Sequence, residues 1–227
     1  TMKRTPTLFC SLALLLSALI GVAPAHAGPR DAVTVSRPPV GQGAAFVPGT
    51  RALDTLPGPA YVEEEFFVSG RASLFNYAHN PPRDAADIVA VASGVPYRTR
   101  LIVRRPAAPE DFNGTVVVEW WNSSAGFDSA PVWDQSASYF ARRGIVYVGV
   151  TNSTTSIGFL AGGCRVFGAL PPACGSRYAT LELPENGLAY EMMSQVATLL
   201  RRAGTGNPLP PAFEVKRLFH AGESQQA

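Results

Sequence analysis

Three apolar segments separated by two amphipathic ones dominate the second half of the chain. Residues 115–121 contain three consecutive valines, residues 145–150 read Ile-Val-Tyr-Val-Gly-Val, and residues 215–221 end in a third apolar run. Such runs are typical of strands buried on both faces of a parallel sheet. Residues 133–143 and 188–203 carry apolar residues at helical spacing, and each is followed by a glycine. This order predicts a βαβαβ unit.

The segments that precede this unit predict antiparallel strands. Residues 61–68 and 72–77 flank Gly70, and we expect the two to form a hairpin that turns at this glycine. Residues 97–105 alternate in character, which predicts a half-exposed strand. We therefore expect an α/β fold, with a mixed sheet that starts antiparallel, becomes parallel and is flanked by helices. The predicted inner face of residues 97–105 carries Tyr97, Thr99, Leu101 and Val103, and the outer face carries Arg98, Arg100 and Arg104.

The last predicted strand leads directly into Gly222-Glu223-Ser224. A strand followed by Gly-x-Ser is typical of the nucleophile elbow of serine hydrolases, which makes Ser224 the candidate nucleophile. The sharp turn lifts the hydroxyl above the sheet, at a helix N-terminus that favours developing negative charge. Gln226 stands where a second small residue is expected, so the pattern departs from Gly-x-Ser-x-Gly. The alternative is an ordinary turn at the end of a strand.

An oxyanion hole requires two N–H donors. The residue after the nucleophile, Gln225, is expected to supply one of them. The other is expected from the loop after the 115–121 strand, which gives Trp121, Asn122 or Ser123 as candidates. Packing is the alternative role for these three residues.

Neither histidine of the predicted mature chain is expected to act as the base. His79 falls in the loop after the predicted hairpin, and His220 lies within the strand that feeds the elbow. In hydrolases with this elbow, the acid and the histidine follow the serine along the chain. We therefore expect both partners beyond Ala227, and no activity from this chain alone.

The N-terminus has the pattern of a secretory signal peptide. Two basic residues precede an apolar stretch at 8–22, and an Ala-x-Ala-type cleavage site follows at 25–27. The stretch is short for a bilayer span, which needs about 20 apolar residues, so we expect no stable membrane anchor. We predict cleavage after Ala27 and a secreted or periplasmic protein. Without residues 1–27, 17 basic residues balance 17 acidic ones, which gives no reason to expect nucleic-acid binding.

The predicted mature chain divides into an extended arm, residues 28–59, and one domain, residues 60–227. The arm is rich in Pro and Gly and has little periodicity. We expect export to favour a disulfide between Cys164 and Cys174, with two free thiols as the alternative. The surrounding segment, residues 151–185, is expected to be irregular, either a lid over the site or a surface loop held by the disulfide.

The sequence gives no pattern for a metal or a cofactor. No histidine lies close to the two cysteines, and no glycine pattern for a dinucleotide or phosphate follows a strand. Glu63-Glu64-Glu65 could form an acidic metal patch. Because alternation places Glu64 opposite its two neighbours, we expect a solvated face instead.

Four segments, in this order, resemble a known family, the exported "alpha/beta hydrolase domain" proteins of the α/β-hydrolase superfamily. The resemblance covers residues 61–227. It implies the N-terminal two-thirds or less of an α/β-hydrolase fold that ends at the nucleophile elbow. It also implies a catalytic serine at Ser224 and an esterase-like activity on a small-molecule or polymeric ester. The segments are YVEEEFFVSG (61–70), PYRTR (96–100), FNGTVVVEW (112–120) and GESQ (222–225).

A function of another class is an exported carbohydrate- or ligand-binding domain on a hydrolase-like scaffold. This hypothesis depends on three aromatic side chains that we expect to be exposed, those of Trp121, Trp133 and Tyr139. Within the enzyme hypothesis, the sequence leaves open whether the acyl transfer cleaves an ester, an amide or a polyester.

Overall fold

The computed structural model describes residues 33–84, 87–165, 173–202, 204 and 206–224. The predicted signal peptide, residues 1–27, lies outside this part of the chain. The strands are β1 Thr34–Ser36, β2 Tyr61–Tyr77, β3 Ile88–Pro106, β4 Thr115–Trp120, β5 Val146–Val150 and β6 Arg217–Gly222. The helices are α1 Pro131–Arg143, α2 Thr154–Ala161 and α3 Ala189–Arg201, and short 3-10 turns occur at Leu53–Thr55, Pro109–Asp111 and Asn186–Leu188.

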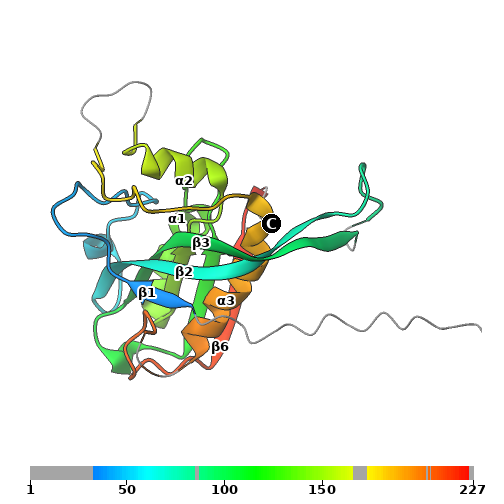
Figure 1. Ribbon diagram of the computed structural model, residues 1–227. Coiled ribbons are helices and arrows are strands. Elements are labelled where there is room, and N and C mark those ends of the chain that lie inside the picture. Colours follow the sequence, from blue (N-terminus) through cyan, green and yellow to red (C-terminus); the bar gives the residue numbers. More distant parts are fainter. Residues whose placement is uncertain (1–32, 85–86, 166–172, 203, 205, 225–227) are drawn as a thin grey trace, which may run out of the picture. The chain divides into compact units, whose positions relative to one another are not determined.

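The six strands form one mixed sheet with the order β1-β2-β3-β5-β4-β6 (Figure 1). The β1–β2, β2–β3 and β3–β5 pairs are antiparallel. β4 runs parallel to both of its neighbours, β5 and β6. The sheet therefore starts antiparallel and becomes parallel, which confirms the fold class predicted from the order of the segments.

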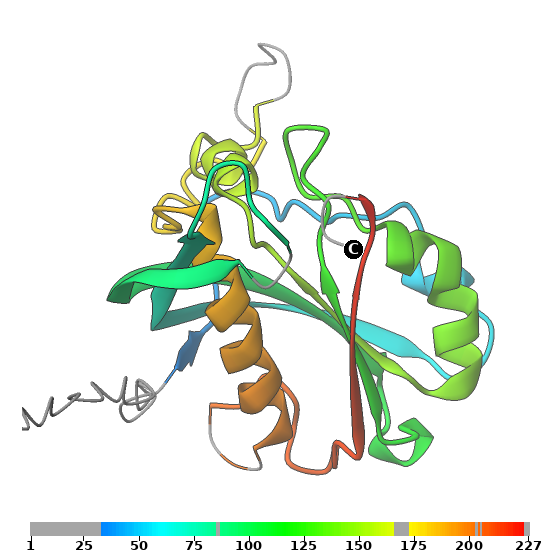
Figure 2. The same ribbon diagram turned by 90° about the vertical axis from the view of Figure 1, so that its right-hand side faces the viewer.

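Two helices cover opposite faces of the parallel strands, α1 on one side and α3 on the other (Figure 2). α1 buries four apolar residues at helical spacing, and Gly144 ends it in the left-handed conformation with φ 61°. All of β5 and the first five residues of β4 are buried, which explains the apolar run of β5 and the three consecutive valines of β4. The buried residues of α1 are Trp133, Ala137, Phe140 and Ala141.

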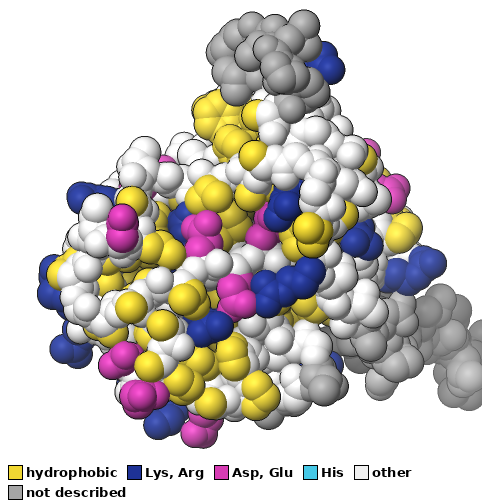
Figure 3. All heavy atoms as spheres, turned by 90° about the vertical axis from the view of Figure 1, so that its left-hand side faces the viewer, with side chains coloured by type: hydrophobic (Ala, Val, Ile, Leu, Met, Phe, Trp, Pro, Cys, Tyr) yellow, Lys and Arg dark blue, Asp and Glu magenta, His cyan; other side chains and the backbone are white. Residues whose placement is uncertain are grey.

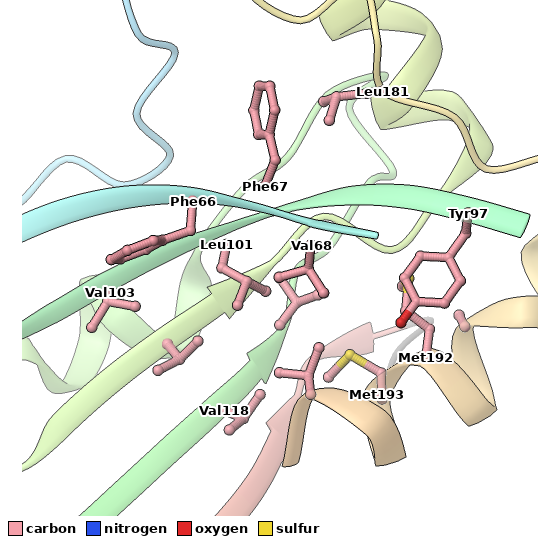
Figure 4. Packing of buried hydrophobic residues seen from close by; sticks show 14 of the residues in the cluster. Phe66, Phe67, Val68, Tyr97, Leu101, Val103, Val118, Leu181, Met192 and Met193 are labelled. Carbon is pink, nitrogen blue, oxygen red and sulfur yellow. The ribbon is translucent and has the colours of Figure 1, made fainter. Parts of the chain in front are cut away.

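The antiparallel strands contribute to both faces of the core. Figure 4 shows Val68 and Leu101 pointing from β2 and β3 toward Met193 of α3. Phe67 points to the other side, toward Leu181. At about 25 cal/mol per Å² of buried apolar area, such side chains provide the main stabilisation of the fold.

The predicted hairpin at Gly70 is wrong. Residues 61–77 form the single strand β2, which pairs with β3 along its whole length, and the chain turns only between Tyr77 and Ile88. Gly70 is required for space and not for a turn, because a Cβ there would lie 2.8 Å from the Tyr97 hydroxyl. That hydroxyl donates a hydrogen bond to Gln195 of α3, at 2.6 Å.

The prediction that residues 97–105 form a half-exposed strand is also wrong. Arg100 and Arg104 on the predicted outer face are 0% and 1% exposed. The N-terminal arm covers this face, and the carbonyl oxygens of Phe46 and Pro48 accept hydrogen bonds from the two guanidinium groups at 2.6 Å each. A strand covered on both sides can carry arginines only where each charge is paired.

The glutamates of β2 supply that pairing, so the expectation of a solvated acidic face is wrong too. The predicted alternation holds, because Glu63 and Glu65 bind arginines on one face and Glu64 binds Arg105 from the other. The ion pairs are Glu63–Arg104 at 2.7 Å, Glu64–Arg105 at 2.7 Å, Glu64–Arg37 at 2.6 Å, Glu65–Arg177 at 2.6 Å and Glu65–Arg100 at 3.4 Å.

The segment 151–185 contains the helix α2, which sequence reasoning missed. The predicted disulfide between Cys164 and Cys174 is present, and both cysteines are buried. The backbone of Ala173 accepts a hydrogen bond from Ala44, so the bridged part is attached to the N-terminal arm. Residues 154–161 are only weakly amphipathic, and their apolar residues are irregularly spaced. The sequence therefore did not indicate a helix there.

Charged side chains of both signs lie next to one another on the face that Figure 3 draws. This mixture agrees with the small formal net charge of +2 for the whole chain. Of the helices in the described ranges, none combines the length and the apolar character that a membrane span requires.

Candidate active site

The candidate site lies at the edge of the sheet where the three parallel strands end (Figure 2). Trp120, the last residue of β4, is paired with Val150 on one side and with Gly222 on the other. The loops that follow β4, β5 and β6 therefore start side by side. In open α/β sheets, ligands bind at this carboxyl edge of the strands.

Ser224 is exposed two residues beyond the end of β6. Its φ is 62°, and Ser224 and Cys164 are the two non-glycine residues with positive φ in the described part of the chain. A non-glycine residue in this region is strained by about 1–3 kcal/mol, and such residues cluster at active sites. The turn after β6 thus has a strained, exposed serine shortly after the end of a parallel strand.

Asn122 connects this turn to the loop after β4. Its side-chain Nδ2 donates a hydrogen bond to the carbonyl oxygen of Glu223 at 3.2 Å, and its Oδ1 accepts one from the N–H of Ser124 at 2.9 Å. The residue is 7% exposed. Asn122 therefore holds two loops of the sheet edge in a fixed relation.

The backbone N–H groups of the two oxyanion candidates that precede Ser123 already have acceptors. Trp121 N–H donates to Val150 at 3.4 Å, and Asn122 N–H donates to Ser129 at 3.2 Å. The N–H of Ser123 has no acceptor among the described residues. Gln225 lies outside the described residues. Of the three loop candidates, Ser123 has the N–H that is available to a ligand.

The tryptophans are arranged differently from our expectation. Trp121 and Trp133 are 0% exposed, so two of the three aromatic residues that motivated the binding-domain hypothesis are part of the core. The Trp121 indole donates to the Tyr147 hydroxyl at 2.7 Å and lies over Gly149, where a Cβ would come within 2.1 Å of the ring. It is Trp120 that remains partly exposed at the site.

A cavity of about 570 Å³ opens beside Trp120. Five segments of the chain line it: the end of β2, the start of β3, the end of β4 with its loop, the start of α2, and the turn before α3 together with Tyr190. Ser224 does not line the cavity, but the strand that carries it is the neighbour of β4. The volume is in the range of about 300–1,000 Å³ typical of small-molecule sites.

The two histidines do not complete a catalytic arrangement within the described residues. His79 lies in the β2–β3 turn, where its Nδ1 is 2.8 Å from Asp87 Oδ1. His220 lies on β6 against the ring of Trp120, with the ring centroids 5.9 Å apart. Partial burial against Trp120 lowers the pKa of His220. No hydrogen bond joins either histidine to Ser224 in this part of the chain.

A buried ion pair anchors the loop that carries Asn122 and Ser123. Arg100 Nη2 lies 2.7 Å from Asp128 Oδ2, and their side chains are 0% and 1% exposed. Burial alone would lower the pKa of Arg100. The interactions of its guanidinium with Asp128, Tyr178 and Glu65 outweigh burial, so the pKa is raised. Sequence reasoning missed this pair. The alternating arginines of β3 and glutamates of β2 indicate pairing between those two strands, but no local pattern indicates Asp128, which lies in the loop after β4.

A second buried carboxylate fixes the other end of the same loop. Glu119 of β4 is 0% exposed and accepts hydrogen bonds from the N–H groups of Val132 and Trp133, at 3.0 and 3.2 Å. It also accepts one from the Tyr147 hydroxyl at 2.6 Å. Burial raises the pKa of Glu119, although these hydrogen bonds partly oppose the shift. The carboxylate thus binds α1 by its first N–H groups, where a helix favours negative charge.

Comparison with known proteins agrees with this arrangement. A family model described as "Alpha/beta hydrolase domain" matches residues 35–227, which includes most of the predicted N-terminal arm. Searches of curated proteins and of solved structures gave no significant match. Among the described residues, no group of three or more His, Cys, Asp or Glu side chains is placed to hold a metal ion. On its sequence and its mixed sheet, the chain belongs to the alpha/beta hydrolase domain family.

Proposed function

We propose that this protein is a serine hydrolase that cleaves carboxylic esters through an acyl-enzyme. The observation that carries the proposal is the strained backbone of Ser224, with φ 62° and an exposed side chain, at the end of a parallel strand. An ordinary turn would place glycine, asparagine or aspartate in this conformation more readily than serine. Membership of the alpha/beta hydrolase domain family supports the same reading.

In the proposed mechanism, the Ser224 oxygen attacks the acyl carbon and a histidine accepts the hydroxyl proton. The same histidine returns the proton to the departing alcohol, and water then releases the acid by the reverse sequence of steps. Because a serine hydroxyl is a weak nucleophile until a base removes its proton, the histidine is essential. In hydrolases with this elbow, the acid and the histidine follow the serine along the chain.

The oxyanion is proposed to be bound by the N–H groups of Gln225 and Ser123. Ser123 is favoured over Trp121 and Asn122 because its N–H has no acceptor among the described residues. Removing one donor of this kind reduces kcat by about 10²–10³-fold in a well-studied protease. The contact between Asn122 and Glu223 holds the two donor-bearing loops together.

Export belongs to the proposal as well. The basic, apolar and small-residue pattern of residues 1–27 supports a secreted or periplasmic protein that meets its ester substrate outside the cytoplasm. We expect no nucleic-acid partner and no cofactor for this chemistry.

The test uses a fluorophosphonate probe on the full-length protein. We expect stoichiometric labelling of the wild type and no labelling of Ser224→Ala. Ser194→Ala is the matched control, because Ser194 is an exposed serine of α3 and should leave labelling unchanged. Labelling that persists in Ser224→Ala, or that never occurs in the wild type, would refute the assignment.

A further inference from the structure

The cavity beside Trp120 begins one strand away from the proposed nucleophile. Trp120 is the register partner of Gly222, and Ser224 follows Gly222 by two residues. Ser123 lines the cavity and belongs to the loop that Asn122 joins to Glu223. A substrate whose acyl carbon lies at Ser224 would therefore extend naturally into this cavity.

Three aromatic rings form one wall of the cavity. Tyr190 meets Trp120 edge-to-face, with centroids 5.6 Å apart and planes at 72°. It meets Phe75 in the same way, at 6.3 Å and 81°. Tyr190 is 49% exposed although it stands between two other rings. Such a wall provides a rigid apolar surface at a low cost in side-chain entropy.

Most of the other described lining residues carry uncharged polar side chains. The Asn186 Oδ1 accepts a hydrogen bond from Thr154 N–H at 2.8 Å, which leaves its two N–H donors for a ligand. Ser153 Oγ accepts one from Thr155 N–H at 3.1 Å, which leaves its hydroxyl proton as a donor. The hydroxyls of Ser123 and Ser124 have no partner among the described residues. These groups can both donate and accept hydrogen bonds.

Among the described residues, the lining contains no Asp, Glu, Lys, Arg or His. A carboxylate or an ammonium group that entered would lose hydration without gaining a charged partner, and this is costly. A ligand rich in hydroxyl groups would instead exchange its bonds to water for bonds to hydroxyls and amides, and place its apolar face against the rings. The lining chemistry thus selects against charge and for hydroxyl groups.

We infer that this cavity binds the uncharged polyhydroxylated part of the substrate, so that the ester cleaved at Ser224 is an acylated neutral sugar or a similar polyol. The inference rests on the proposed function, since it assigns the cavity to the substrate of Ser224. The aromatic residues proposed to contact the carbohydrate are therefore Trp120, Tyr190 and Phe75. They replace the three residues expected from the sequence, Trp121, Trp133 and Tyr139.

The experiment is calorimetric titration of the full-length Ser224→Ala protein with p-nitrophenyl glucoside and p-nitrophenyl glucuronide. The two ligands differ by one carboxylate, and neither needs to be hydrolysed. We expect the glucoside to bind at least tenfold more tightly. Tyr190→Ala should weaken glucoside binding at least tenfold. Tyr139→Ala, which removes an exposed tyrosine of α1, should leave it unchanged.

Hydrolysis provides the second arm. In the wild type, we expect kcat/KM for acetate release from acetylated methyl glucoside to exceed that from acetylated methyl glucuronoside at least tenfold. Equal affinity for the two p-nitrophenyl ligands, or a Tyr190→Ala protein that binds like the parent, would overturn the inference even if the fluorophosphonate labels Ser224. Selective binding without any labelling would support the neutral-polyol site but overturn its assignment to an ester.

Discussion

Replacing Arg100 should lower the stability of the fold, because it leaves a buried carboxylate without its ion-pair partner. Its guanidinium is 0% exposed and binds Asp128 at 2.7 Å, the Phe46 carbonyl at 2.6 Å and Thr151 Oγ1 at 3.2 Å. In Arg100→Met, Asp128 would remain 1% exposed, with the Thr151 hydroxyl as its remaining hydrogen-bond donor. Breaking a buried ion pair in this way costs about 3–5 kcal/mol.

The cost should be measurable by both urea and thermal unfolding. A domain of about 150–250 residues loses about 2–4 °C of Tm per kcal/mol, so Arg100→Met should unfold about 6–20 °C lower than the wild type. The matched control is Arg105→Met on the same strand. Its partner Glu64 is 22% exposed and keeps Arg37 at 2.6 Å, so the loss should be about 1 kcal/mol or less.

A double mutant separates the unpaired charge from lost packing. If the orphaned carboxylate causes most of the damage, Asp128→Asn should restore part of the stability of Arg100→Met instead of adding a second loss. The reasoning fails if Arg100→Met is no less stable than Arg105→Met. It also fails if the two substitutions at positions 100 and 128 are simply additive.

Two further predictions concern the disulfide and the buried Glu119. Cys164 and Cys174 are 10 residues apart, so replacing both with alanine should lower the free energy of unfolding by about 3 kcal/mol in urea titrations; an unchanged midpoint would contradict this. Because burial raises the pKa of Glu119, the folded protein holds this proton more tightly than the unfolded chain, and its contribution to stability must fall as pH rises from about 4.3 through the raised pKa. Between pH 4 and 8, the free energy of unfolding of Glu119→Gln should therefore increase relative to that of the wild type as pH rises. A relative decrease would show that the pKa of Glu119 is shifted in the opposite direction.

Much of the parallel half of the fold could be predicted, because its signals are local. The valines of β4 and the apolar run of β5 report burial on both faces, and the spacing of Trp133, Ala137 and Phe140 reports the inner face of α1. The pattern around Ser224 is local as well. Its role as nucleophile nevertheless stays a prediction until the labelling experiment is done.

The antiparallel half was predicted less well because its signals were ambiguous. Gly70 is consistent with either a turn or a close contact, and the sequence does not show that the Tyr97 hydroxyl lies against Gly70, which decides between them. Trp121 was wrongly expected to be exposed. Its ring is buried because Gly149, on another strand, has no side chain and leaves room for it, and the sequence does not show that contact. Trp120 is only partly buried against one core cluster, whereas its neighbour Trp121 is fully buried in the other.

The sequence by itself determined where the parallel strands and their helices lie, and which serine follows the last strand, since hydrophobic periodicity and a short motif span only a few residues. The tertiary structure decided which groups pair with the charged side chains and which shape the cavity has. Arg100 meets Asp128 28 residues away and Phe46 54 residues away, and five separate segments line the cavity. Burial penalises an unpaired charge wherever it lies, but only the folded sheet brings such distant groups within hydrogen-bonding distance.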